Sequence, residues 1–211
     1  MTDIKICGLS TPETIDAAAA AGATHVGFVF FAASPRNLSP ERAADLASRV
    51  PPHVRKVGVF VDPDDALLDA AMPALDIIQL HGTEAPARAA TLRARYGKPV
   101  WRAAGVASAA DIRAAIAAAR GNCDLLLLDA KAPSEAPLPG GNGLRFDWRL
   151  LTDARPDLPW GLSGGLDAGN VAEAIRGCGP ALVDVSSGVE EASGVKSVTK
   201  IRAFIEAART A

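Results

Sequence analysis

Residues 3–30 read DIKICGLSTPETIDAAAAAGATHVGFVF and contain one strand–helix–strand unit. The first run, residues 4–7, is short, apolar and β-branched, which is typical of a buried strand. An Ala-rich stretch with helical spacing follows at residues 12–21, and Gly22 comes where that helix should end. A second apolar run at residues 25–30 then predicts a strand parallel to the first.

This unit recurs to the end of the chain, so that eight apolar runs alternate with eight helical stretches. Most runs are apolar on both faces, as parallel strands covered on both sides should be. Eight units in 211 residues fit the small end of the (β/α)8 range, whereas an open doubly wound sheet would usually need fewer strands. We predict an α/β fold, one (β/α)8 TIM barrel in a single domain over residues 1–211. The expected strands are 4–7, 25–30, 56–61, 76–80, 100–103, 125–129, 160–163 and 182–186, and the expected helices are 12–21, 40–49, 63–72, 86–96, 109–120, 147–153, 168–175 and 198–209.

Local signals support several of these helix boundaries. Ser, Thr, Asp and Pro are favoured where helices begin, and Gly is favoured just past their ends. The entry signals are Ser10-Thr11-Pro12-Glu13, Ser39-Pro40-Glu41 and Asp62-Pro63, and the expected end signals are Gly22, Gly97, Gly121 and Gly177.

Composition excludes several classes of function. The chain is 49% hydrophobic and 22% charged with a net charge of −2, so it lacks the basic excess of most nucleic-acid binders. Aromatic residues make up 5%, too few for a surface on which bases stack. No apolar run reaches the roughly 18 residues of a membrane span. We therefore expect neither a nucleic-acid partner nor a membrane partner.

The three cysteines, Cys7, Cys123 and Cys178, are odd in number and far apart. This spacing fits neither a disulfide framework nor a compact zinc cluster. The N-terminus begins directly with a strand-like segment, without the charged start and apolar stretch of a signal peptide. We expect a cytoplasmic protein with no metal site.

Position in the barrel sorts the reactive side chains. Active sites of such barrels lie at the carboxyl ends of the strands. Cys7 ends the first expected strand, His81 follows the fourth, Asp129 ends the sixth, and residues 186–188 end the eighth. These positions predict one shared catalytic face. The other cysteines and histidines fall at the opposite ends of the strands, where we expect structural roles; they are Cys123, Cys178, His25 and His53.

Cys7 and Asp129 are the candidate catalytic residues. A free cysteine is most often a small buried hydrophobe, but Cys7 stands at a strand end and precedes a glycine. Asp129 follows a run of leucines, where a lone carboxylate is costly to bury, and a helix cap or a loop ion pair is its structural alternative. Apolar surroundings would raise the pKa of Asp129 and help it to carry a proton, as a general acid must.

Two glycine-containing turns predict an anion site. Gly164-Gly165 follows the seventh expected strand, and Ser187-Gly188 follows the eighth. Glycines let backbone N–H groups approach an anion, and barrels often hold a phosphate at this location. Two ordinary tight turns are the alternative, which the pairing disfavours. The Gly-Asn-Gly run at 141–143, in the longest irregular stretch, would add a further wall to the pocket.

Lys5 and Asp184 are expected to form an ion pair inside the barrel. They lie two residues inward from Cys7 and Ser186, on strands that become neighbours when the barrel closes. Neither charge could be buried unpaired. The Lys5 charge could also ease ionisation of the Cys7 thiol.

Three further polar residues are expected near the rim. Arg36 follows the second expected strand and could either face solvent or grip a carboxylate or hydroxyl, and position alone leaves both open. Gln79 and His81 surround the end of the fourth strand. Because no second histidine shares that face, His81 is not expected to bind a metal.

Together these motifs resemble the phosphoribosylanthranilate isomerase family of the tryptophan pathway. The resemblance covers essentially the whole chain, and the ordered set is far more specific than any one piece. The matching pieces are Lys5-Ile6-Cys7-Gly8-Leu9, Gly27-Phe28-Val29-Phe30, Ser34-Pro35-Arg36, Val57-Gly58-Val59-Phe60-Val61, Gln79-Leu80-His81-Gly82, Leu128-Asp129, Gly143 with Phe146-Asp147-Trp148, Leu162-Ser163-Gly164-Gly165-Leu166 with Asn170-Val171, and Val183-Asp184-Val185-Ser186-Ser187-Gly188-Val189-Glu190.

The resemblance implies a cofactor-free (β/α)8 barrel that converts N-(5-phosphoribosyl)anthranilate to its 1-deoxyribulose 5-phosphate isomer by an Amadori rearrangement. By position it implies Asp129 as the general acid on the furanose ring oxygen and Cys7 as the general base on the C2 proton. The partner it implies is a small phosphorylated sugar. The expected substrate-binding residues are Arg36 at the anthranilate end, Gln79, His81, Gly141, Gly143 and Asp184, and the expected phosphate-binding residues are Gly164, Gly165, Ser187 and Gly188.

Three positions depart from the family's usual pattern. Asn142 replaces a Thr or Ser between two glycines, Gly169 replaces a Pro, and Ser197 replaces an Asp. None belongs to the implied acid–base pair. We therefore expect these departures to affect fine substrate contacts and not the reaction.

Two other functions stay open from the sequence. The related sugar isomerase of the histidine pathway also acts on a phosphoribosyl aminoaldose, but it pairs two aspartates and has a clear half-barrel repeat, whereas Cys7 occupies the first strand here. A non-catalytic phosphate-binding barrel would keep the glycine loops without needing Cys7 or Asp129. The sequence leaves the choice between a monomer and a homodimer open.

Overall fold

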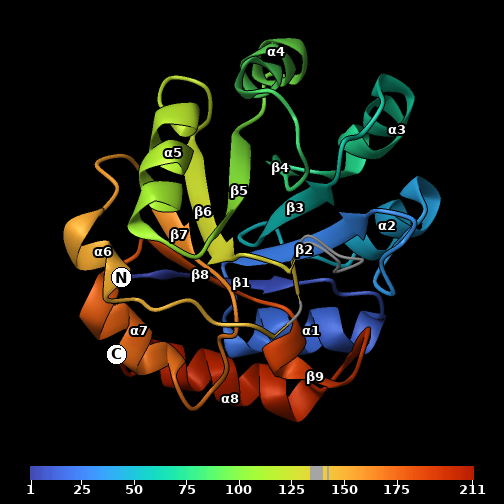
Figure 1. The fold of residues 1–211 in the computed structure, drawn as a ribbon. Coiled ribbons are helices and arrows are strands. Elements are labelled where there is room, and N and C mark those ends of the chain that lie inside the picture. The colour runs from blue at the N-terminus through green and yellow to red at the C-terminus, as the bar shows by residue number, and fades with distance from the viewer. Residues whose placement is uncertain (134–139, 142) are drawn as a thin grey trace.

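Eight parallel strands close into a barrel ringed by helices in the computed structural model, which describes residues 1–133, 140–141 and 143–211 (Figure 1). Each strand pairs with the next along the chain, and β8 pairs with β1 to close the sheet. The predicted (β/α)8 barrel is confirmed. The strands are β1 Asp3–Cys7, β2 His25–Phe30, β3 Arg55–Phe60, β4 Ile77–Leu80, β5 Val100–Val106, β6 Leu125–Ala130, β7 Trp160–Leu162 and β8 Leu182–Val185. The helices are α1 Pro12–Ala21, α2 Pro40–Ala47, α3 Asp65–Ala71, α4 Pro86–Tyr96, α5 Ala109–Ala119, α6 Leu150–Asp153, α7 Val171–Cys178 and α8 Val198–Arg209.

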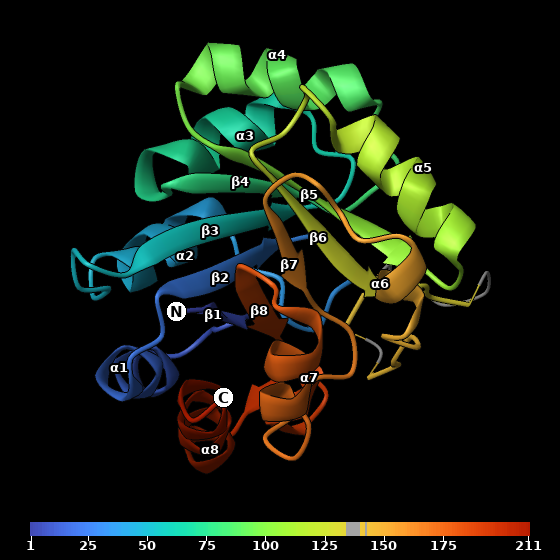
Figure 2. The same cartoon turned by 90° about the vertical axis from the view of Figure 1, so that its left-hand side faces the viewer.

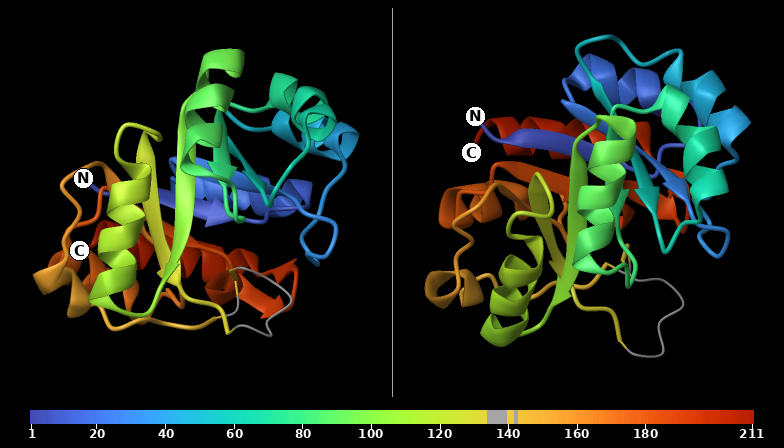
Figure 3. Two further views of the ribbon diagram at one scale, coloured as in Figure 1. Left: turned by 45° about the horizontal axis from the view of Figure 1, so that its top comes forward. Right: turned by 90° about the horizontal axis from the view of Figure 1, so that it is seen from above.

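The strands are buried on both faces, which explains their nearly continuous apolar sequences. All residues of β2 and of β6 are buried. Successive side chains of a strand point alternately into the barrel and towards the helices. The helices surround the sheet from outside in every view (Figures 2 and 3). Each strand therefore needs apolar residues at both kinds of position.

The interior of the barrel is closed at one end by apolar side chains. These come mainly from the amino-terminal halves of the strands and form a packed cluster, as in other barrels of this kind. Cys7, Val29 and Val59 form a smaller cluster nearer the carboxyl ends. Open space for a ligand is therefore left at the carboxyl ends. The members of the larger cluster are Val57, Ile77, Trp101, Ala103, Leu125, Leu127 and Leu182.

Capping side chains fix several helix starts. Thr11, Ser39 and Ser197 each accept a hydrogen bond from the backbone N–H three residues later, which satisfies a donor that a helix start leaves free. The predicted bounds of α1, α4 and α8 are confirmed. No helix in the described part of the chain has both the length and the apolar character to cross a membrane.

Several strand and helix ends differ from the expected ranges by up to three residues, and two of the predicted helix signals are wrong. Asp62-Pro63 does not start α3, because Asp64 caps that helix while Asp62 turns with φ 44° and accepts a hydrogen bond from the N–H of Thr83. Gly177 lies inside α7, and Gly179 makes the left-handed turn that ends it, with φ 62°. Both errors move helix ends by a few residues and leave the order of elements unchanged.

A short hairpin follows β8 and was not predicted. It begins after the 3-10 turn η2 (Ser187–Val189) and pairs β9 (Glu190–Ala192) with β10 (Val195–Lys196) in antiparallel fashion. Strands of two and three residues carry no periodicity that a sequence could show. The hairpin places Glu190 and Lys196 beside the loop that follows β2, since Gly194 lies against Pro35.

Candidate active site

One pocket at the carboxyl ends of the strands collects the site residues that the sequence predicts. It encloses about 800 Å³, its open mouth included, which suits a small-molecule ligand. Asn142 lies outside the described residues, whereas the glycines on either side of it line the pocket. The predicted residues that line it are Cys7, Arg36, Gln79, His81, Asp129, Gly141, Gly143, Gly164, Gly165, Asp184, Ser187 and Gly188.

Lys5 and Asp184 form the predicted ion pair beneath this pocket, which Asp184 lines. The two residues stand opposite each other in the β1–β8 register, and Nζ of Lys5 donates to the two carboxylate oxygens of Asp184 at 2.9 and 3.0 Å. Lys5 is completely buried. Burial by itself would lower the pKa of Lys5, but the adjacent Asp184 carboxylate reverses the effect and the pKa is raised. Lys5 is therefore a fixed positive charge.

Cys7 ends β1 directly above this pair. Its side chain fits because Gly27 on the neighbouring strand has no Cβ, which would come within 3.0 Å of Sγ. Burial raises the pKa of the Cys7 thiol, and the Lys5 charge opposes that rise only in part. Lys5 acts in the expected direction, but burial is the larger effect. In the free protein Cys7 is a thiol at neutral pH.

Asp129 is buried at the end of β6 and makes neither of the structural contacts that were its alternatives. Its Oδ1 accepts a hydrogen bond from the N–H of Ala130 at 2.8 Å, so it caps no helix. Its Oδ2 lies 3.5 Å from Nε2 of His81, but burial lowers the pKa of His81 to about 4, so this imidazole is neutral and forms no ion pair. Burial raises the pKa of Asp129 to about 7. The carboxyl group can therefore hold or release a proton near neutral pH.

Gln79 and His81 present polar atoms without partners. Oε1 of Gln79 and Nε2 of His81 are buried and have no hydrogen-bond partner within the described part of the chain. A buried unpaired polar atom is costly, and both side chains line the pocket. Gly140 passes so close that a Cβ there would lie 2.5 Å from Cε1 of His81 and 2.6 Å from Oδ2 of Asp129. Ligand hydroxyls are suitable partners for the two unpaired atoms.

The glycine turns after β7 and β8 lie against each other and line the same pocket. Gly164 and Gly165 adopt φ values of 84° and 62°, which other residues rarely take. A Cβ at Gly188 would come within 1.9 Å of the carbonyl oxygen of Leu166, so the two turns touch through their backbones. Such turns expose N–H groups to an anion. The two turns therefore form part of one pocket and are not two unrelated tight turns.

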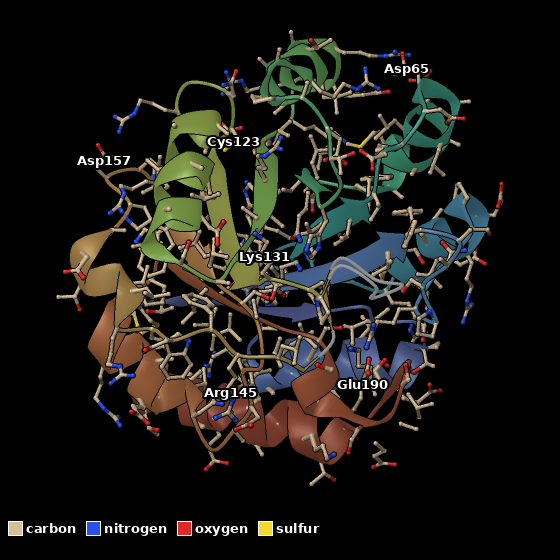
Figure 4. All side chains as sticks on the ribbon, in the orientation of Figure 1. Asp65, Cys123, Lys131, Arg145, Asp157 and Glu190 are labelled. Atoms are coloured by element: carbon tan, nitrogen blue, oxygen red, sulfur yellow. The ribbon has the colours of Figure 1, made fainter. Side chains whose placement is uncertain are left out.

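Arg36 belongs to a buried ionic cluster that the sequence did not predict. Its Nε and Nη2 each donate to a carboxylate oxygen of Glu190 at 2.7 Å, and Nζ of Lys196 donates to the same carboxylate at 2.7 Å. Arg36 is only 5% exposed, so the solvent-facing alternative is excluded. Glu190 closes the last sequence motif, but nothing in its spacing links it to a residue 154 positions earlier. Figure 4 shows Glu190 on the hairpin beside α8.

Two of the three departures from the family pattern keep a structural role. Gly169 donates its N–H to the carboxylate of Asp167 at 2.8 Å, a bond that proline could not make. Ser197 caps α8 by accepting from the N–H of Lys200 at 3.4 Å. Gly169 therefore supports the turn before α7, and Ser197 supports the start of α8.

The described residues contain no group of three or more His, Cys, Asp or Glu side chains placed to hold a metal ion. The fold and the pocket define a (β/α)8-barrel enzyme whose pocket at the carboxyl ends of the strands holds buried polar side chains. Comparison with known proteins gives the particular family. The family described as N-(5'phosphoribosyl)anthranilate (PRA) isomerase matches residues 4–207. The chain belongs to this family.

Individual relatives agree along their full lengths. An N-(5'-phosphoribosyl)anthranilate isomerase of Parvibaculum lavamentivorans is 55% identical over 99% of this chain and 98% of the relative. The crystal structure of phosphoribosyl anthranilate isomerase from Thermotoga maritima is 37% identical, with a TM-score of 0.86 and complete coverage of both chains. A further isomerase of this name, solved in complex with reduced 1-(o-carboxyphenylamino)-1-deoxyribulose 5-phosphate, is 35% identical, with a TM-score of 0.84 and complete coverage. The chain is thus an aldose–ketose isomerase that acts in tryptophan biosynthesis.

Proposed function

We propose that the protein isomerises N-(5'-phosphoribosyl)anthranilate by an Amadori rearrangement, with Asp129 as general acid and Cys7 as general base. The observation that carries the proposal is the opening of both buried groups onto one pocket, with the pKa of Asp129 raised by burial to about 7. A protonated carboxyl group at neutral pH is what a general acid requires.

The reaction needs two proton transfers, one from Asp129 to the substrate and one from the substrate to Cys7. Asp129 gives its proton to the furanose ring oxygen, the bond from C1 to that oxygen breaks, and the nitrogen lone pair forms a C1=N iminium. The Cys7 thiol loses its proton to solvent, and the resulting thiolate takes the C2 proton. The C–H electrons form the C1=C2 bond of an enolamine while the C1=N bond returns its electrons to nitrogen. Loss of the enol proton and protonation of C1 give the ketone. The positive iminium adds to Lys5 in favouring the thiolate during this step.

The pocket suits a substrate with a phosphate at one end and a carboxylated ring at the other. The turns at Gly164-Gly165 and Ser187-Gly188 are suited to the phosphate. Gln79 and His81 offer unpaired atoms to sugar hydroxyls. Arg36 stands beside the aromatic ring in this arrangement. The relative solved with a reduced product analogue supports binding of such a molecule in this fold.

The proposed partner is this small phosphorylated sugar. The three cysteines are free and lie far apart in the sequence, which supports a reducing compartment such as the cytoplasm as the site of action. No cofactor enters the proposed steps, because the proton donor and the proton acceptor are both side chains of the chain itself.

Turnover of N-(5'-phosphoribosyl)anthranilate tests the proposal. We expect Cys7→Ala and Asp129→Asn each to lower kcat at least about 100-fold while the reduced product analogue still binds, because each removes one proton-transfer group. Cys123→Ala and Asp157→Asn are matched controls, since Cys123 precedes β6 and Asp157 is an exposed surface residue. Near-normal turnover in both active-site variants would show that the roles are wrong, and binding without turnover by the wild type would favour a non-catalytic barrel.

A further inference from the structure

The ion pair between Arg36 and Glu190 leaves one guanidinium nitrogen for a ligand. Nε and Nη2 of Arg36 are occupied by the two oxygens of Glu190. Nη1 makes no hydrogen bond within the described residues, and Arg36 lines the pocket. A Cβ at Gly141 would lie 3.0 Å from Nη1, so this nitrogen points towards the loop that borders the pocket.

The stem of Arg36 is also held in one orientation. A Cβ at Gly8 would come within 2.6 Å of Cδ of Arg36, and Gly8 has a φ of 76° that favours glycine. The aliphatic part of the Arg36 side chain therefore packs against the backbone of Gly8, while Glu190 binds Nε and Nη2 of the guanidinium. A bidentate pair of this kind fixes both the direction and the plane of a guanidinium.

Lys196 forms a second ion pair with Glu190. Its Nζ donates to Oε1 of Glu190, and also to the carbonyl and the hydroxyl oxygen of Ser186 at 2.9 and 3.0 Å. Although burial alone would raise it, the pKa of Glu190 is lowered by Arg36 and Lys196 together. Two cations and one carboxylate leave one net positive charge at this edge of the pocket. An anionic group of the substrate would neutralise it.

We propose that Glu190 is a positioning residue that selects for the ring carboxylate of the substrate by aiming Nη1 of Arg36 at it. This inference rests on the proposed function, in which the substrate is an anthranilate derivative. Among the described residues that line the pocket, Arg36 is the single arginine or lysine. The phosphate has the glycine turns, so the carboxylate is left for Arg36. Val29, Phe31 and Val59 line the same pocket and supply an apolar surface for the ring.

Calorimetric binding of two analogues tests the inference. One is reduced 1-(o-carboxyphenylamino)-1-deoxyribulose 5-phosphate, and the other is the same molecule without the ring carboxylate. We expect the wild type to prefer the carboxylated analogue by about tenfold or more, as one charge-assisted hydrogen bond would give. We expect Glu190→Gln to lose most of this preference while its affinity for the second analogue changes little. Glu191→Gln, the same change at the exposed next residue, should keep the preference.

Glu190→Gln leaves buried cations without their counter-ion and could therefore disturb folding. Two further variants distinguish such a folding defect from the loss of positioning. Lys196→Met keeps the Arg36–Glu190 pair and should keep the preference, whereas Glu190→Gln combined with Lys196→Met should lose it. In kinetics we expect Glu190→Gln to raise KM more than it lowers kcat. A preference that persists in both Glu190 variants, or equal losses of affinity for both analogues, would overturn the inference while the proposed function stands. Failure of the wild type to bind either analogue would overturn the proposed function itself.

Discussion

At the residue scale, the buried carboxyl group of Asp129 sets the pH dependence that we expect. Burial raises the pKa of this group to about 7 in the free protein, and the proposed acid must be protonated. The proposed base Cys7 must in addition be a thiolate, and burial raises the pKa of its thiol. Between about pH 7 and that thiol pKa, the loss of protonated Asp129 offsets the gain of thiolate. We therefore predict that kcat/KM rises with pH below about 7, approaching tenfold per pH unit, and levels off above it. Rates measured from pH 5.5 to 9 check this. A profile that keeps rising through pH 7 without levelling off would mean that Asp129 does not donate the proton.

The same group predicts an unusual dependence of stability on pH. The pKa of Asp129 is about 7 in the folded protein and about 3.8 in the unfolded chain, so between these values the folded state binds a proton that the unfolded state has lost. Stability from this group is present below about pH 4 and is lost as pH rises to 7. Asp129→Asn should therefore be more stable than wild type at pH 8, on the order of 2–4 kcal/mol. Urea unfolding at pH 4 and pH 8 should show the gain only at pH 8.

Replacing Lys5 is expected to lower the unfolding free energy, whereas replacing Asp129 raises it at pH 8. Lys5→Met leaves the buried carboxylate of Asp184 without its partner, which we expect to cost about 3–5 kcal/mol of unfolding free energy. Combining it with Asp184→Leu should recover much of that loss, because an apolar pair replaces the ion pair. Urea unfolding of the two single variants and the double variant measures the coupling. Independent, additive losses would contradict the pairing.

At the element scale, the contact between the turns after β7 and β8 depends on Gly188. A Cβ there meets the carbonyl oxygen of Leu166 at 1.9 Å, and backbone cannot rotate away as a side chain can. We predict that Gly188→Ala separates the turns, raises KM at least about tenfold and weakens the affinity for inorganic phosphate. Gly177→Ala is the control, because Gly177 lies inside α7 with open space around it. That change should leave KM unaltered and stabilise the protein by up to about 1 kcal/mol.

The elements also show what a sequence can predict. Periodicity and turn residues predicted the order of the strands and helices, because each βα unit must bury its own apolar faces. They missed the β9–β10 hairpin, whose strands are too short to show a pattern. Residues at strand ends, such as Cys7 and Asp129, could be placed because barrel geometry brings all strand ends together. The cluster of Arg36, Glu190 and Lys196 could not, since the loop after β2 and the β9–β10 hairpin are distant in sequence and meet only after the barrel closes.

At the scale of the whole molecule, closing the barrel brings the first and last units together. Lys5 and Asp184 meet across the β1–β8 seam, and α1 lies beside α8 on the outside (Figure 2). Arg209 near the C-terminus donates to the carbonyl oxygen of Gly22 after α1. The floor of the pocket therefore exists only when the seam is closed. Loss of the last unit should abolish the site and not merely loosen it.

Phe204 tests how far the outer layer acts on the site. It is fully buried on α8, so Phe204→Ala should lower the unfolding free energy by about 3–5 kcal/mol through the cavity that it leaves. At 20 °C, well below the transition, we expect kcat/KM within about twofold of wild type, because the ring supports packing and not the pocket. Thermal unfolding and steady-state rates measure the two effects. A large loss of kcat/KM at unchanged stability would instead mean that α8 acts on the pocket, and the contact from Nζ of Lys200 to the backbone oxygen of Glu190 offers the route.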